Sequence, residues 1–273
     1  MRRLVVVGSV SGAPGVTTTA LALAAAWPPQ ADGGVRPVVV EADCSGGDLM
    51  MRFGLPPAPS LLDVAAAAGK PYPGSLLGAV AELPFGVRAV VAVPGRRPCT
   101  EAVRLLATEG GRRVLLGEED NQGTVLLDAG RLVEDVSPLL RAANEVVLVT
   151  GGGAEALTHV SAYGLDSDVF AGRLTLGVVG RCPYRAEEIS QTLGIERVLF
   201  LPWDTKTGGM MSSPRRRPLR TTGHRIPPLV AAARKLARQL ASGRDHDDEA
   251  DSKAVEQSRR GLVHATADDG SES

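Results

Sequence analysis

A short loop of small residues near the N-terminus is the stretch best suited to chemistry. It follows an apolar, β-branched run at residues 5–7 and leads into an Ala/Leu-rich segment at residues 20–27. Between these two segments lie glycines and hydroxyl residues, among them Gly12, Gly15 and Thr17. A strand, a tight turn and a helix start, in this order, direct backbone N–H groups at one point, where they bind an anion. The order of residue types therefore predicts a phosphate-binding loop.

The loop departs from the P-loop pattern G-x-x-x-x-G-K-[ST] at its charged position. The second glycine of the pattern corresponds to Gly15 and its magnesium-binding hydroxyl to Thr17. Val10 replaces the first glycine, and Val16 replaces the lysine that places a point charge on the β and γ phosphates. Loss of one such group typically costs on the order of 10² to 10³ in rate, so binding can survive where fast hydrolysis does not. A glycine-rich turn of an ordinary α/β fold is the alternative at this step.

Aspartates follow two other apolar runs. Asp43 comes shortly after the run at residues 38–40, and Asp128 directly follows the run at residues 124–127. Ligands of α/β folds bind at the carboxyl ends of the strands. Two carboxylates on neighbouring strand ends beside a phosphate loop usually hold Mg²⁺ and position water. We therefore expect Asp43 and Asp128 to lie beside the loop, although Asp43 taken alone is better explained as a turn or capping residue.

The rest of the chain alternates short apolar runs with helical segments, which implies right-handed crossovers. The fold class is α/β, with a mainly parallel sheet of about seven strands. We expect one domain over residues 1–241 and a disordered polar tail over residues 242–273. The further strands are predicted at residues 38–40, 87–93, 124–128, 145–150, 174–180 and 198–201, and the helices at residues 17–27, 100–107 (with Thr100 as a cap), 154–163, 186–193 and 227–240.

Composition narrows the functional classes. The net charge is −1 over 273 residues, so nothing global indicates a nucleic-acid or anionic-membrane partner. Cys44, Cys99 and Cys182 are far apart and odd in number, which indicates neither a disulfide framework nor a zinc site and suits a reducing cytosol. No apolar stretch reaches the roughly 20 residues of a membrane span. The apolar run after Arg2 and Arg3 ends in the glycine-rich loop, which favours a strand over a signal peptide.

Basic residues gather near the C-terminal end of the predicted domain. An arginine cluster at residues 215–225 precedes the last predicted helix, and Arg234, Lys235 and Arg238 lie opposite the apolar face of that helix. This pattern favours a helix packed on the sheet with solvated cations over a helix lying on a membrane surface.

The loop and strand-end motifs together resemble the MinD/ParA class of deviant P-loop ATPases, whose loop reads K-G-G-x-G-K-T-T. Residues 11–18 read S-G-A-P-G-V-T-T. The segments at residues 41–43, 126–128, 144–150 and 201–204 are similar to further motifs of this class, in the same order, over about residues 1–240. The resemblance implies a three-layer α/β/α P-loop NTPase fold, a cytoplasmic protein, and ATP and Mg²⁺ as cofactors.

The resemblance also implies roles for individual residues. Thr17 would hold Mg²⁺, Thr18 the α-phosphate, and Asp128 the metal through water. Asp43 would act on the attacking water or as a switch, so Asp43 and Asp128 are the implied catalytic residues. The implied nucleotide-binding residues are Ser11, Gly12, Ala13, Gly15, Val16, Thr17 and Thr18.

Both lysines of the class are missing. Its first lysine, which reaches across a nucleotide-sandwich dimer, corresponds to Ser11, and its ordinary P-loop lysine corresponds to Val16. This loss is similar to that in the divergent TadZ and CpaE proteins, which localise the assembly of tight-adherence pili. The resemblance therefore implies weak or absent ATPase activity and a positioning or assembly role through protein partners, with homodimerisation and peripheral membrane contact left open. Arg181 is either a substitute cation or a solvated loop residue.

Two other functions stay open. The first is an active ParA-type partition ATPase that uses the arginine cluster at residues 215–225 to bind DNA non-specifically, in a salt-sensitive manner. The near-zero net charge counts against it. The second is an ATP-using enzyme of cofactor biosynthesis, for which the sequence offers no identifiable second-substrate site.

Overall fold

A mainly parallel sheet forms the centre of the protein. The computed structural model describes residues 1–12, 15–70, 75–83, 85–164, 170, 172–213 and 226–242. Within these residues the sheet has eight strands in the order β3-β4-β2-β5-β1-β6-β7-β8. Every strand pair is parallel except β3 with β4, where a two-residue strand at the edge runs antiparallel. The predicted α/β class and mainly parallel sheet are confirmed, and β3 is the strand that the sequence patterns did not indicate.

The strands are short runs of β-branched and aliphatic residues, most of them buried on both faces. Val5 and Val7 point into the core on one side of the sheet, while Leu4 and Val6 point into the core on the other. Such two-sided burial is why the runs show no polar alternation. The strands are β1 (Arg3–Ser9), β2 (Val38–Glu41), β3 (Ala81–Glu82), β4 (Arg88–Val90), β5 (Thr124–Arg131), β6 (Glu145–Gly151), β7 (Leu174–Val179) and β8 (Arg197–Leu201).

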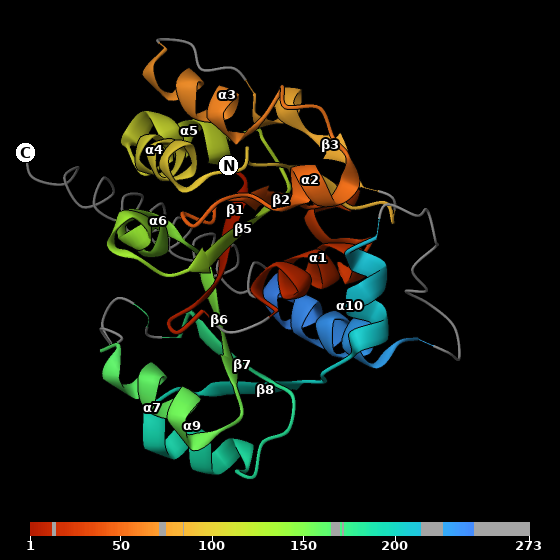
Figure 1. The fold of residues 1–273 in the computed structure, drawn as a ribbon, viewed down its shortest axis with the longest axis vertical. Coiled ribbons are helices and arrows are strands. Elements are labelled where there is room, and N and C mark those ends of the chain that lie inside the picture. The colour runs from red at the N-terminus through yellow and green to blue at the C-terminus, as the bar shows by residue number, and fades with distance from the viewer. Residues whose placement is uncertain are drawn as a thin grey trace, which may run out of the picture.

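Helices cover both faces of the sheet (Figure 1). One layer contains α3 to α7 and α9, and the other contains α1, α2, α10 and a last helix over residues 228–242, which we call the terminal helix. The α-helices are α1 (Val16–Ala26), α2 (Leu49–Phe53), α3 (Leu61–Ala66), α4 (Arg96–Leu106), α5 (Glu109–Leu116), α6 (Ser137–Ala142), α7 (Ala154–Ala162), α9 (Ala186–Leu193) and α10 (Thr205–Met211), and the short 3₁₀ helices are η1 (Ala31–Gly34), η2 (Ala67–Gly69), η3 (Leu76–Ala79) and η4 (Glu134–Val136).

Helix α4 begins four residues earlier than predicted, so the assignment of Thr100 as its cap is wrong. The helix starts at Arg96, directly after Gly95, whose φ of 117° suits glycine. Pro98 lies in the first turn, where a missing N–H costs no helical hydrogen bond. Thr100 instead donates its hydroxyl to the carbonyl of Cys44 at 3.4 Å.

The terminal helix packs on the sheet through the face that the sequence indicated. Leu229, Val230, Ala233, Leu236 and Leu240 are all buried in the core that also contains α1. None of the helices in the described residues is long and apolar enough to cross a membrane. The three cysteines are free thiols. Most of the predicted tail, residues 243–273, lies outside the described residues, and the domain boundary at residue 241 stays a prediction.

Candidate functional site

The N-terminus of α1 is open and faces the loop that follows β1. Gly15 is the residue before the helix, with a φ of 104°, and Gly12 has a φ of 70°. No side chain among the described residues caps the helix, and its first turn carries no acidic residue. A Cβ atom built at Gly12 or Gly15 would meet nothing within 4 Å. Among the described residues, no side chain therefore caps the first N–H groups of this 11-residue helix, and uncapped N–H groups at a helix start are suited to binding phosphate.

The predicted loop residues differ in how far they can reach a ligand. Ser11 and Gly12 are exposed, and Thr17 and Thr18 are half-buried in the first turn of α1. Ala13 lies outside the described residues. Val16, at the lysine position, is only 6% exposed and belongs to the core that α1 shares with the terminal helix. The loop keeps its backbone and hydroxyl groups, but its lysine position is filled by an apolar core residue.

Asp128 is fully buried within β5, which continues to Arg131, three residues beyond the strand end predicted from the sequence. Its Oδ1 accepts a hydrogen bond from the N–H of Gly130 at 3.2 Å, and its Oδ2 has no hydrogen-bond partner in the described part of the chain. Burial raises the pKa of Asp128 to about 7; the Thr17 hydroxyl opposes this shift, and the Glu41 carboxyl adds to it. A buried carboxylate oxygen without a partner, next to a helix-start threonine, is a site that a cation would satisfy.

Asp43 lies against the same strand. Its Oδ1 accepts hydrogen bonds from the N–H and the hydroxyl of Ser45, at 2.7 and 2.6 Å. Its carboxyl is so close to Gly130 that a Cβ built there would lie 2.0 Å from Asp43 Oδ2. The structure thus brings Asp43, Asp128 and Thr17 together beside the phosphate loop. Asp43 also makes the turn contact that its sequence context favours, and the catalytic roles of both aspartates stay predictions.

Glu41 is a positioning residue; the sequence analysis placed it in a family motif at residues 41–43 but gave it no role. It is 2% exposed, and its Oε1 accepts the N–H groups of Asp48 and Leu49 at 2.7 and 2.9 Å. Its Oε2 accepts the N–H of Ala92 at 2.9 Å. These bonds fix the loop after β2, which carries Asp43, to the segment after β4. Burial raises the pKa of Glu41 although all three bonds favour its charged form.

A cavity of about 320 Å³ opens beside the loop; we call it the Trp203 cavity. Gly15 and Thr18 line it at the start of α1, and Trp203 lines it from the segment after β8. Trp203 is 61% exposed, and Asp204 next to it caps α10 by accepting the Thr207 N–H at 2.9 Å. The volume is in the range of small-ligand pockets. The sequence patterns placed this segment in a family motif but did not identify Trp203 as a site residue.

The residues present fit a magnesium nucleotide except at one position. Thr17 and Asp128 offer the hard oxygen ligands that Mg²⁺ prefers, and the start of α1 offers N–H groups for phosphate. No group of three or more His, Cys, Asp or Glu side chains in the described residues could hold a metal ion. The missing element is the cation that Val16 replaces.

The other cations proposed from the sequence do not supply this charge in the described structure. Arg181 is exposed on the loop after β7, as expected for a solvated residue. The arginine cluster at residues 215–225 lies outside the described residues. Within the part of the chain that the structure describes, the site is built from backbone, hydroxyl and carboxylate groups.

We expect Gly130→Ala to destabilise the protein by displacing Asp43. Gly130 has a φ of 55°, so an alanine there is strained and also meets the Asp43 carboxyl. Gly194→Ala is the matched control, since Gly194 has a φ of 67° with nothing within 4 Å of its Cβ position. Urea unfolding should show a loss of about 1 kcal/mol for the control and about 2–3 kcal/mol for Gly130→Ala. Equal losses would mean that Asp43 moves away without cost.

Comparison with known proteins identifies the fold. No protein-family model and no curated protein matches the sequence. The cell division ATPase MinD of Pyrococcus furiosus is similar with a TM-score of 0.65 and 20% identity, over 88% of this chain and 98% of that chain. The septum site-determining protein MinD of Pyrococcus horikoshii, complexed with Mg-ADP, gives 0.64 and 18%, over 88% and 96%. A ParA family ATPase of Chlorobium tepidum gives 0.63 and 15%, over 88% and 98%. The chain therefore has the fold of the MinD and ParA P-loop ATPases.

Proposed function

We propose that this protein binds a magnesium nucleotide, hydrolyses it slowly or not at all, and acts as an intracellular positioning or assembly factor through protein partners. The observation that carries the proposal is the buried, unpartnered Oδ2 of Asp128 beside Thr17, combined with an apolar residue at the lysine position. The first feature favours retained metal and nucleotide binding. The second favours loss of catalysis.

Each residue of the site has a distinct part in this proposal. The N–H groups at the start of α1 and the Thr18 hydroxyl hold phosphate oxygens, and Thr17 and Asp128 hold Mg²⁺. The ion supplies positive charge to the phosphates when it is bound. Asp43 holds the attacking water or changes position with the bound nucleotide. Because Val16 contributes no charge to the transferring group, the rate falls by on the order of 10² to 10³ relative to a loop with lysine.

The positioning role is supported by the kinds of protein that share the fold. One similar structure is described as a septum site-determining protein and another as a cell division ATPase. The loss of both lysines is similar to that in TadZ and CpaE, so we propose partners in a pilus or secretion assembly and a homodimer that does not depend on ATP. The partition alternative depends on the arginine cluster at residues 215–225, which lies outside the described residues, so we advance no second function.

Trp203 provides a direct test of nucleotide binding, because it lines the cavity next to Gly15 and Thr18. In a Trp27→Phe background, Trp203 is the only tryptophan of the chain. We expect Mg-ADP and Mg-ATP to change its fluorescence saturably, and Thr17→Ala to weaken the Mg²⁺-dependent binding about tenfold, the value of one lost charge-assisted contact. Thr192→Ala, which removes an exposed hydroxyl on α9, is the control and should bind as the parent does.

The outcomes separate binding from catalysis. Absence of Mg²⁺-dependent binding in the parent would contradict the nucleotide part of the proposal. Turnover of ATP that Asp43→Ala or Asp128→Ala abolishes would contradict the slow-hydrolysis part and leave binding intact.

A further inference from the structure

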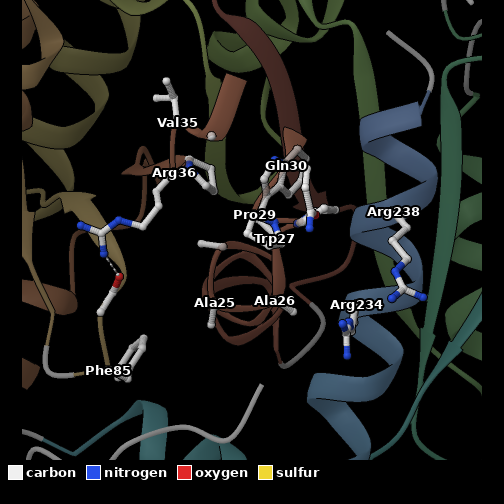
Figure 2. Close-up of a pocket in the computed structure, with 15 residues that line it drawn as sticks. Ala25, Ala26, Trp27, Pro29, Gln30, Val35, Arg36, Phe85, Arg234 and Arg238 are labelled. Carbon is white, nitrogen blue, oxygen red and sulfur yellow. Dashed lines mark hydrogen bonds between the residues drawn. The ribbon is translucent and has the colours of Figure 1, made fainter. Parts of the chain in front are cut away.

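A second cavity lies at the end of α1 opposite the phosphate loop. Its volume is about 390 Å³, within the range of small-ligand pockets. The last turn of α1 and Trp27 line it, and we call it the arginine cavity. Figure 2 shows Arg234 and Arg238 on the terminal helix at one side of the α1 end, and Arg36 and Phe85 at the other.

The charged side chains that line this cavity are all arginines. Arg36, Arg234 and Arg238 line it, and no aspartate or glutamate does so among the described residues. Arg36 donates to the Glu82 carboxylate at 3.2 Å and to the Gly86 carbonyl at 2.9 Å, so its charge is partly compensated. The guanidinium of Arg238 is exposed and has neither an ion pair nor a hydrogen bond within the described part of the chain. A guanidinium with five free donors on a cavity wall is suited to a carboxylate or a phosphate.

The rest of the lining is apolar and partly aromatic. Ala25, Ala26 and Pro29 line the cavity beside Trp27, and Phe85 lines it from the chain segment before β4. Trp27 is 8% exposed, and its Nε1–H donates to Asp32 Oδ2 at 3.2 Å, so its indole N–H is not available to a ligand. Phe85 packs edge-on against Phe53, with ring centroids 5.9 Å apart, which holds its ring in place. The cavity thus combines fixed aromatic surface with a cation.

We propose that the arginine cavity binds a small organic anion, with a flat apolar body against Trp27 and Pro29 and a phosphate or carboxylate group on Arg238. Such a ligand pairs with Arg238 and also covers the apolar surface of the cavity. Inorganic phosphate would leave the apolar surface uncovered, and an uncharged ring would leave Arg238 without an anion. The site is separate from the phosphate loop and does not depend on the nucleotide proposal. The alternative is that the arginines only complement the carbonyl end of α1, which requires no ligand.

The test uses three probes. 1-Naphthyl phosphate carries both the aromatic body and the phosphate, 1-naphthol carries only the aromatic body, and inorganic phosphate carries only the anion. Isothermal titration calorimetry of the full chain should show that 1-naphthyl phosphate binds at least tenfold more tightly than either of the others. Its affinity should fall as salt is added, because an exposed guanidinium is screened. Equal affinity for 1-naphthol and 1-naphthyl phosphate would overturn the proposal.

Matched variants locate the binding. Arg238→Ala should weaken 1-naphthyl phosphate about tenfold, while Lys235→Ala should leave it unchanged, since Lys235 is an exposed cation of the same helix that does not line the cavity. Thr17→Ala and added Mg-ADP should have no effect. Full affinity in Arg238→Ala would overturn the proposal, and so would loss of binding in Thr17→Ala, which would place the probe on the phosphate loop.

A last variant examines whether the chain itself fills the cavity. Five acidic residues follow the terminal helix within a short stretch, and a full-length variant replaces each of them with its amide: Asp245, Asp247, Asp248, Glu249 and Asp251. This variant should bind 1-naphthyl phosphate as the parent does. Binding tighter by tenfold or more would identify the acidic stretch as the occupant and overturn the small-ligand proposal.

Discussion

Asparagine in place of Asp128 is expected to stabilise the ligand-free protein at pH 8 by about 2 kcal/mol and to remove its stabilisation by Mg-ADP. The pKa of Asp128 is raised from 3.8 to about 7, mainly by burial. A shift of this size corresponds to at most about 4 kcal/mol of destabilisation when the group is ionised. Asparagine keeps the acceptor for the Gly130 N–H but leaves amide hydrogens to be satisfied, which reduces the gain.

The gain should depend on pH with a defined sign. Between about pH 4 and pH 7 the folded protein retains a proton on Asp128 that the unfolded chain has lost, so stability from this group falls as the pH rises through that window. The advantage of Asp128→Asn should therefore be small near pH 4 and reach its full size above pH 7. Urea unfolding at pH 4.5 and pH 8 measures it. An equal advantage at both pH values would show that the buried charge is not its source.

The response to nucleotide should change in the opposite direction. A ligand that binds only the folded state raises the free energy of unfolding, so Mg-ADP should stabilise the parent through the site that contains Asp128. Asp128→Asn removes the carboxylate that we propose as a metal ligand and should show no such effect. A buried carboxylate that lowers stability is commonly retained in a binding site because the function requires it. Mg-ADP stabilisation that survives in Asp128→Asn would exclude Asp128 as a metal ligand.

Lysine in place of Val16 is expected to increase the affinity for Mg-ATP by about tenfold to a hundredfold. One charge-assisted contact is worth about 1.5–3 kcal/mol, which corresponds to that range. Val16 is the first residue of α1, beside the open N–H groups, so a lysine there can run its stem along the core and extend its ammonium toward the loop. Because position 11 still carries serine where the MinD/ParA loop has its other lysine, the variant should regain binding more than hydrolysis.

The substitution should also reduce stability, because Val16 is buried. We expect a loss of about 1–2 kcal/mol in the absence of nucleotide, as a branched core side chain is removed. Val16→Met is the matched control, since it makes a similar change in shape without a charge. Titration of both variants through Trp203 fluorescence, together with urea unfolding, gives the two quantities. Equal affinity of the lysine and methionine variants would mean that phosphates do not occupy this loop.

The α/β fold could be predicted because its signals are local. Two-sided burial leaves continuous apolar runs, and the glycine and threonine spacing of residues 11–18 follows from the geometry of a strand, a tight turn and a helix start. The convergence of Asp43 and Asp128 could be anticipated from their place at the ends of parallel strands. Local signals failed at α4, where they favour Thr100 as the cap although the helix starts at Arg96 and holds Pro98 in its first turn.

The tertiary structure alone decided how the site residues are connected and charged. The Ala92 N–H on Glu41 and the contact of the Asp43 carboxyl with Gly130 each join segments that are far apart in the sequence. The burial of Asp128 Oδ2 likewise depends on the packed structure. The Trp203 cavity and the arginine cavity likewise form between the end of α1 and distant parts of the chain. The sequence by itself determined every strand except β3, the loop and the missing lysines. Burial and long-range hydrogen bonding, which depend on the packing of the whole chain, determined the pKa of Asp128 and the cavities in which a ligand would lie.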